Sequence, residues 1–157
     1  MTDEAIAAAA RTAIEQCLDL GAEESAVVVT DEKRRAIGEA LYEAASAVTE
    51  DASIVRYPPG DQHGAEPPEP VAAAMAAADV FLAPTTKSLS HTRARGDACE
   101  AGARGATLPG ITEEVFLTGL DADYAAIAEH CEDVLAQVAD ADQVRGTPPA
   151  GPDVTFE

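Results

Sequence analysis

The densest group of chemically versatile side chains lies between residues 85 and 95, where hydroxyl, imidazole, ammonium and guanidinium groups follow one another. The apolar run before this segment is typical of a buried strand, and the residues after it are typical of a helix. Ligands of open α/β sheets bind at the carboxyl ends of strands, and helix N-termini present free N–H groups to anions. The segment is therefore a candidate site for an anionic ligand or for contact with another domain or chain. Its candidate residues are Thr85, Thr86, Lys87, Ser88, His91, Arg93 and Arg95.

Basic side chains are concentrated around this candidate segment. Four of the 10 basic residues, Lys87, Arg93, Arg95 and Arg104, fall within it or in the helix expected to follow. A structural alternative remains open, because hydroxyl-rich turns usually cap helices and basic groups pair with acids. The spacing differs from a P-loop, which requires G-x-x-x-x-G-K-S/T, and the glycines at 102–105 indicate only a turn.

The other residues that could do chemistry are scattered along the chain. His63, His91 and His130 form no i, i+4 pair, so a helical metal site is not expected. His63 with Glu66 could bind a metal only loosely, from a Pro-rich loop. No G-x-S-x-G motif occurs, and no cysteine has a nameable activating partner. The sequence therefore predicts no assembled catalytic or metal-binding set in this chain.

The overall charge restricts the partners. The 157 residues include 29 acidic and 10 basic side chains, for a formal net charge of -19. Phosphate backbones and anionic lipids need a basic face, so neither nucleic acid nor membrane is an expected partner. The acidic, Lys-poor, Ala-rich composition is typical of halophilic proteins, because concentrated salt screens the repulsion between like charges.

Cysteine usage and hydropathy indicate the compartment. Cys17, Cys99 and Cys131 are odd in number and widely spaced, which favours buried free thiols in a reducing environment over disulfides. The acidic N-terminal residues do not resemble a signal peptide, and no apolar run is long enough to cross a bilayer. We therefore expect a cytoplasmic protein.

The elements that position the candidate segment alternate between helix and strand. The β-branched run at 25–30 is continuously apolar, which is typical of a strand covered on both faces. Thr2 is the expected N-cap of the first helix. The pattern predicts an α/β fold with three layers, a mostly parallel, Rossmann-like sheet of about four strands flanked by helices. Helices are expected at 3–20, 31–47, 70–77, 91–104 and 112–117, and strands at 25–30, 52–57, 78–83 and 105–108.

A longer helix is expected after residue 120, with Asp121 as its cap and Asp121, Asp123, Glu113 and Glu114 complementing helix dipoles. Its apolar side chains share one face. The residues on that face are Tyr124, Ile127, Cys131, Val134, Leu135 and Val138.

The C-terminal end suggests a second domain. Residues 1–145 are expected to form the α/β domain, and the Pro/Gly-rich segment 146–152 a linker. Polar and apolar residues alternate over 153–157, as at the start of a half-exposed strand. This strand either pairs at a sheet edge or opens a domain that lies outside this chain, and we favour the second interpretation.

The same element order, taken with several motifs, resembles the N-terminal domain of aminopeptidase T-like metallopeptidases, the leucyl aminopeptidase T family. The motifs that carry the resemblance cover nearly the whole chain. They are the strand ending at Val27–Asp31, the stretches Pro58–Gly64 and Glu66–Val71, the segments Pro84–Arg95 and Gly102–Glu114, and the tail Gly151–Phe156.

The resemblance implies removal of N-terminal residues from peptides by a pair of divalent metal ions, zinc, cobalt or magnesium. That family's ligands lie in its C-terminal half, so no residue of this chain corresponds to them. The resemblance therefore implies a chain inactive alone, with a structural role in a homodimer or against a C-terminal domain, near the peptide substrate. The alternative is a small Rossmann-like module that binds an anionic metabolite at Thr85–Arg95.

Overall fold

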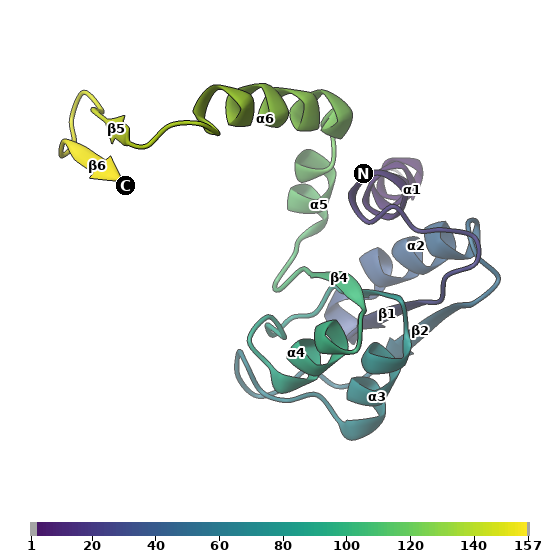
Figure 1. Cartoon of the computed structure of the whole chain (residues 1–157). Helices are drawn as coiled ribbons and strands as arrows, with labels where there is room; N and C mark the ends of the chain where they lie inside the picture. Colours follow the sequence, from purple (N-terminus) through teal and green to yellow (C-terminus); the bar gives the residue numbers. More distant parts are fainter. Residues whose placement is uncertain (1–2, 157) are drawn as a thin grey trace. The chain divides into compact units, whose positions relative to one another are not determined.

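The computed structural model describes residues 3–156, which form two compact units divided between Ala122 and Asp123. The first unit contains a four-stranded sheet with its helices, and the second contains one helix and a two-stranded hairpin (Figure 1). Each unit has its own internal packing and is described by itself.

The elements of the first unit follow the expected alternation of helix and strand. The long helix expected at 3–20 is an α-helix that continues into a π-helical segment, and its expected cap, Thr2, lies outside the described residues. The elements of the first unit, in chain order, are α1 (Asp3–Arg11), η1 (Thr12–Cys17), β1 (Ala26–Thr30), η2 (Glu32–Arg34), α2 (Arg35–Ser46), β2 (Ala52–Arg56), α3 (Glu69–Ala77), β3 (Val80–Ala83), α4 (Arg93–Glu100), β4 (Arg104–Thr107) and α5 (Glu113–Gly119).

The four strands form one parallel sheet in the order β2-β1-β3-β4. Helices α1, α2 and α5 cover one face, where Val28 and Leu82 join their apolar side chains in one core. Helices α3 and α4 cover the other face, where Val27, Val29 and Phe81 join a second core. The expected three-layer α/β fold with a parallel sheet of four strands is confirmed. Its two central strands, β1 and β3, are almost entirely apolar because both of their faces are buried.

Two glycines lie where a side chain would not fit, one between neighbouring strands and one between a helix and the sheet. A Cβ on Gly105 of β4 would lie 2.3 Å from the carbonyl oxygen of Phe81. A Cβ on Gly38 of α2 would lie 2.7 Å from Oγ1 of Thr30, the last residue of β1. The absence of a side chain at Gly38 therefore allows α2 to pack closely against the end of β1.

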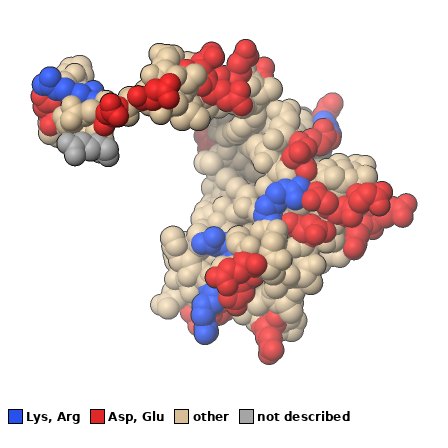
Figure 2. Space-filling model, viewed as in Figure 1, with Lys and Arg blue, Asp and Glu red and all other residues tan. Residues whose placement is uncertain are grey.

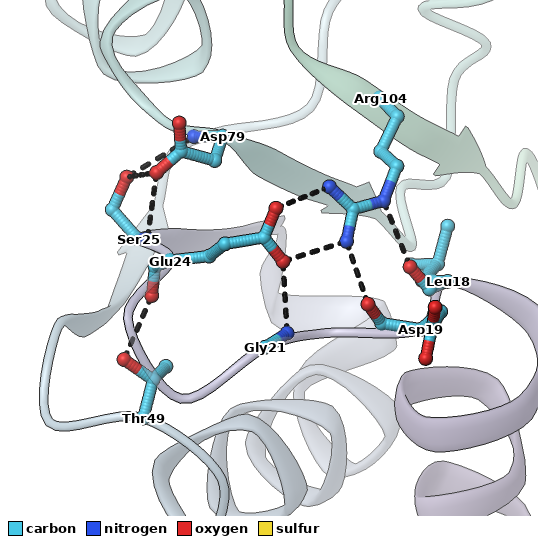
Figure 3. A network of polar contacts seen from close by, with 8 residues as sticks. All are labelled: Leu18, Asp19, Gly21, Glu24, Ser25, Thr49, Asp79 and Arg104. Carbon is cyan, nitrogen blue, oxygen red and sulfur yellow. Dashed lines mark hydrogen bonds and ion pairs between the residues drawn. The ribbon is translucent and has the colours of Figure 1, made fainter.

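A polar network ties together the amino ends of the strands (Figure 3). The Arg104 guanidinium donates to both carboxylate oxygens of Glu24, at 2.6 and 2.7 Å, and to the carbonyl of Leu18 at 2.8 Å. Asp79 accepts from the backbone N–H and the hydroxyl of Ser25, both at 2.8 Å. Bonds from Arg104, with one from a backbone N–H, lower the pKa of Glu24 to about 2.

Arg104 therefore does not join the basic group around residues 87–95. It begins β4 at the amino end of the sheet, whereas the segment that follows β3 leaves from the carboxyl end. The sequence places these residues close together along the chain, but parallel strands separate the two ends of a helical crossover by the length of the strand.

The second unit consists of α6 (Tyr124–Val138) and the antiparallel strands β5 (Val144–Gly146) and β6 (Val154–Phe156). The α6 cap is Asp123, whose carboxylate accepts from the Ala126 N–H at 3.0 Å, so the expected cap Asp121 is wrong. No residue of α6 is buried, and Leu135 on its apolar face is 62% exposed. The strand expected within 153–157 is observed, and it forms a hairpin with β5.

The three cysteines are free, as expected, but all are exposed, so their expected burial is wrong. In η1 and α4 neighbouring side chains face the core instead: Ile14 is buried in η1, which contains Cys17, and Ala98 is buried in α4, which contains Cys99. Cys131 lies on α6, none of whose residues is buried. No helix among residues 3–156 is both long enough and apolar enough to cross a membrane.

Candidate functional site

The strand order places a topological switch point between β1 and β3. The chain moves from β1 to β2 on one side and then crosses to β3 on the other side of β1. In open α/β sheets the crevice at such a point, outside the carboxyl ends of the strands, is the usual ligand site. The residues that follow β1 and β3 are therefore the first place to look for a functional site.

A buried carboxylate joins these two strand ends. Asp31 is 0% exposed and accepts hydrogen bonds from both the backbone N–H and the hydroxyl of Thr86, the latter at 2.8 Å. The Lys33 N–H donates to the same carboxylate at 3.0 Å, which begins η2. Burial, and then the charge of Asp31, raise the pKa of Tyr57, which follows β2. The Asp31–Thr86 pair therefore fixes the loops on both sides of the switch point.

The first part of the segment expected to bind an anion uses its polar groups internally. The Thr85 hydroxyl donates to the Lys87 carbonyl at 2.7 Å. The Ser88 N–H donates to Nδ1 of His63 at 3.2 Å, and the Ser88 carbonyl accepts from the Gly64 N–H at 2.9 Å. These bonds hold the two loops together, so most of these groups are engaged within the protein.

The N-terminus of α4 already holds an anion, which is the protein's own. The Glu66 carboxylate accepts from the N–H groups of Arg93 and Ala94, at 2.8 and 3.2 Å, and pairs with the Arg93 guanidinium at 3.6 Å. These bonds, led by the Arg93 N–H, lower the pKa of Glu66. Thr92 accepts from the Arg95 N–H and completes the cap. Helix capping, the structural alternative for this segment, therefore explains the backbone contacts of residues 92–95.

Three further candidate side chains differ in their surroundings. The Arg95 guanidinium donates to the Ser90 carbonyl at 3.1 Å. His91 is exposed and Lys87 is half-buried, and neither side chain has a polar partner among residues 3–156. Of the candidate residues, Thr85, Thr86 and Lys87 lie at the switch point, because they follow the end of β3 and Thr86 bonds to Asp31 after β1.

A cavity of about 270 Å³ lies beside the switch point, between the N-termini of α2 and α5. Lys33 and Arg34 lie on its α2 side, and Glu113 and Glu114 on its α5 side. Within the described part of the chain, neither basic residue forms an ion pair with either glutamate. The Nε of Arg34 is buried and has no hydrogen-bond partner among the described residues.

The basic residues of this cavity can be identified in the sequence, although they match no known motif. Lys33, Arg34 and Arg35 are three consecutive basic residues directly after a buried strand. Their position directly after a strand, rather than a known motif, indicates that they lie at the edge of the sheet formed by the carboxyl ends of the strands.

The described residues contain no group of three His, Cys, Asp or Glu placed to hold a metal ion. His63 and Glu66, the loose metal pair considered from the sequence, each have another partner. Nδ1 of His63 accepts from Ser88, and both oxygens of Glu66 cap α4.

No protein-family model and no curated protein matches this chain. Among solved structures it is similar to the 2,5-dihydroxypyridine dioxygenase of Pseudomonas putida KT2440, with a TM-score of 0.69 and 15% sequence identity. The match covers 98% of this chain and 47% of that one, so this chain spans about half the length of its structural neighbour. At this identity the likeness shows the fold alone.

The comparisons overturn the resemblance to the aminopeptidase T-like family. The matching structure is a dioxygenase, and the expected descriptions aminopeptidase, metallopeptidase and hydrolase are wrong. The physical reason is that the motifs that suggested the family are strand ends, turns and helix caps, which any α/β fold of this order uses. What this chain shares with a solved protein is the α/β architecture.

Proposed function

We propose that the first unit is a small-molecule binding module whose cavity between α2 and α5 receives an anionic group, a carboxylate or a phosphate. The observation that supports this proposal is the buried Nε of Arg34, which has no acceptor within the described residues. A buried donor without a partner costs about 1–3 kcal/mol, which a bound anion would recover. The planar guanidinium fork suits both carboxylate and phosphate oxygens.

This proposal keeps the anionic ligand expected from the sequence. It places the main contact of that ligand at Arg34 instead of at the Thr85–Arg95 segment. The N-terminus of α4, where the anion was expected, is occupied by Glu66. The side chains of Lys33 and Arg34, by contrast, have no carboxylate partner within residues 3–156. Because Asp31 bonds to both Lys33 and Thr86, the two loops meet at one place, and Lys87 of the expected segment remains a second candidate contact.

We place this activity in the cytoplasm. Cys17, Cys99 and Cys131 are free and exposed, and exposed thiols persist in a reducing compartment.

The test is ligand-induced stabilisation, measured as the thermal unfolding midpoint of the whole chain with inorganic phosphate, acetate or citrate at constant ionic strength. A ligand that binds only the folded state at about a hundred times its Kd stabilises it by about 2.7 kcal/mol. We expect at least one anion to raise the midpoint, and Arg34→Met to abolish that rise while keeping the apolar stem.

The matched control is Arg11→Met, an exposed arginine in the last turn of α1, which should leave the shift unchanged. If Lys87→Met abolishes the shift and Arg34→Met does not, the ligand binds at the Thr85–Arg95 segment instead. The absence of any anion-induced shift would overturn the proposal.

A further inference from the structure

The outer edge of β2 is open. This strand is last in the sheet order, and among residues 3–156 it pairs only with β1. The carbonyl of Asp51 accepts from Ala26, and the N–H of Tyr57 donates to Thr30, so odd-numbered residues direct their backbone groups toward β1. The even-numbered residues direct theirs away from it, because successive peptide groups alternate in direction. The open edge is formed by Ala52, Ile54 and Arg56.

β2 lacks most of the features that block strand addition. Natural edge strands are protected by Pro, charged side chains (especially Lys), bulges or very short length, and of these β2 has only the charged Arg56 at its end. β2 contains no Pro or Lys, and its register with β1 is continuous over all 5 residues. β4, the other edge, is shorter and contains Gly105, which weakens strand pairing. The β2 edge is therefore the one suited to accept another strand.

Hollows lie beside β2 on both faces of the sheet. A cavity of about 410 Å³ on the α2 side is lined by Ile54, Arg56 and Tyr42. A second cavity, of about 340 Å³, on the α3 side is lined by Ser53 and Val55 together with alanines of α3. The side chains of an added strand alternate between the two faces, so both hollows lie where such side chains would enter.

The charge of the chain indicates where two copies can approach each other. Acidic side chains spread over the visible surface in Figure 2, and the net charge of -19 opposes self-association. In the larger hollow, however, Arg35 and Arg56 lie with Glu39 and Glu43, and both arginines also pair with Glu32, Arg56 at 3.0 Å and Arg35 at 3.9 Å. The charged side chains at this edge are therefore largely paired with one another, and a two-fold axis would place this nearly balanced surface against itself.

We propose that a second copy of this chain adds to the sheet by antiparallel pairing of β2 with β2, centred on Ile54. In this register Ile54 faces Ile54 of the second copy, and Arg56 faces Ala52. Both are hydrogen-bonded pairs that exchange two backbone bonds each, since all three residues present their N–H and C=O groups outward. The long Arg56 side chain lies opposite the small Ala52. The two four-stranded sheets join into one continuous sheet.

The test is to measure the molar mass of the whole chain by sedimentation velocity over a range of protein concentrations. The buffer contains molar salt, which screens the net charge. We expect a concentration-dependent dimer. Ile54→Pro removes an open-edge N–H without removing a bond to β1, and Ile54→Lys places two like charges at the two-fold axis. Each should raise the dimer Kd by about tenfold or more.

Ile54→Thr is the matched control, because it keeps the N–H and the β-branched shape, and it should dimerise like the wild type. If Ile54→Pro fails to fold, as judged by its circular dichroism spectrum, Ile54→Lys decides the question. Leu135→Asp on α6 separates this interface from association through the second unit.

A wild-type chain that stays monomeric at all concentrations would overturn the inference. So would a dimer that Leu135→Asp dissociates and the Ile54 variants leave intact. A second readout is amide hydrogen exchange. The N–H groups of Ile54 and Arg56 should exchange more slowly as the protein concentration rises. The outcome of the anion-binding test does not affect this one, because the β2 edge and the cavity between α2 and α5 have different lining residues.

Discussion

The carboxylate of Asp31 accepts two hydrogen bonds from the single residue Thr86, one from its backbone N–H and one from its hydroxyl. This contact joins the carboxyl ends of β1 and β3 across the switch point of the sheet. Asp31 is fully buried, so these bonds and the one from Lys33 replace the water that the carboxylate loses on folding. The loop that carries Lys33 and the loop that carries Lys87 are therefore fixed by one side chain.

Asp31→Asn should destabilise the protein by about 1–3 kcal/mol, because the amide has one acceptor oxygen and leaves a buried donor unpaired. Thr86→Val removes only the hydroxyl donor and should cost about 1 kcal/mol. The measurement is the free energy of unfolding from urea titrations. Two variants as stable as the wild type would show that the pair does not hold the loops.

Glu24→Gln should make stability less dependent on acid pH. The folded pKa of Glu24 is about 2, below its ordinary value of 4.5, so the ionised form contributes stability above about pH 4.5. That contribution is lost as pH falls toward 2. We expect the wild-type urea midpoint to fall more steeply between about pH 5 and pH 2 than that of Glu24→Gln. Glu23→Gln, at an exposed neighbour, should retain the wild-type slope.

Glu66→Ala should expose the N-terminus of α4. The N–H groups of Arg93 and Ala94 lose their acceptor, so the urea midpoint should fall. Inorganic phosphate should then restore more stability to this variant than it adds to the wild type, because it can occupy the vacated position. Equal phosphate effects on both proteins would contradict this account of the α4 cap.

Alanine at two helical glycines should have opposite effects. Gly38→Ala brings a Cβ to 2.7 Å from the Thr30 side chain, and the overpacking should cost about 1–3 kcal/mol. Gly96→Ala in α4 meets nothing within 4 Å and should stabilise the helix by about 0.5–1 kcal/mol. Thermal unfolding of both variants, compared with the wild type, checks the prediction. A destabilised Gly96→Ala would indicate that this helix surface is covered.

Much of the fold follows from local sequence patterns. The β-branched run before Asp31 predicted a strand buried on both faces, and β1 is observed at Ala26–Thr30. Asp31 was expected to open a helix, and it caps η2, which leads into α2. Hydrophobic periodicity and capping act over a few residues, so they can be identified in one sequence.

The candidate site could be predicted only in part. Thr85, Thr86 and Lys87 lie at the carboxyl edge, as their position after an apolar strand indicated. Glu66, however, reaches the N-terminus of α4 from 27 residues away. The sequence suggested a weak metal ligand there, because no local pattern shows which distant donor satisfies a helix end.

By itself, the sequence determined the alternation of helices and strands, the parallel sheet and the excess of acidic charge. Only the tertiary structure decided which charges meet. Arg104 pairs with Glu24 across 80 residues, and the Nε of Arg34 remains without a hydrogen-bond partner among the described residues. The physical reason is that strand order sets these meetings, and hydrogen bonds and ion pairs depend on distances of a few ångströms that residue types do not encode.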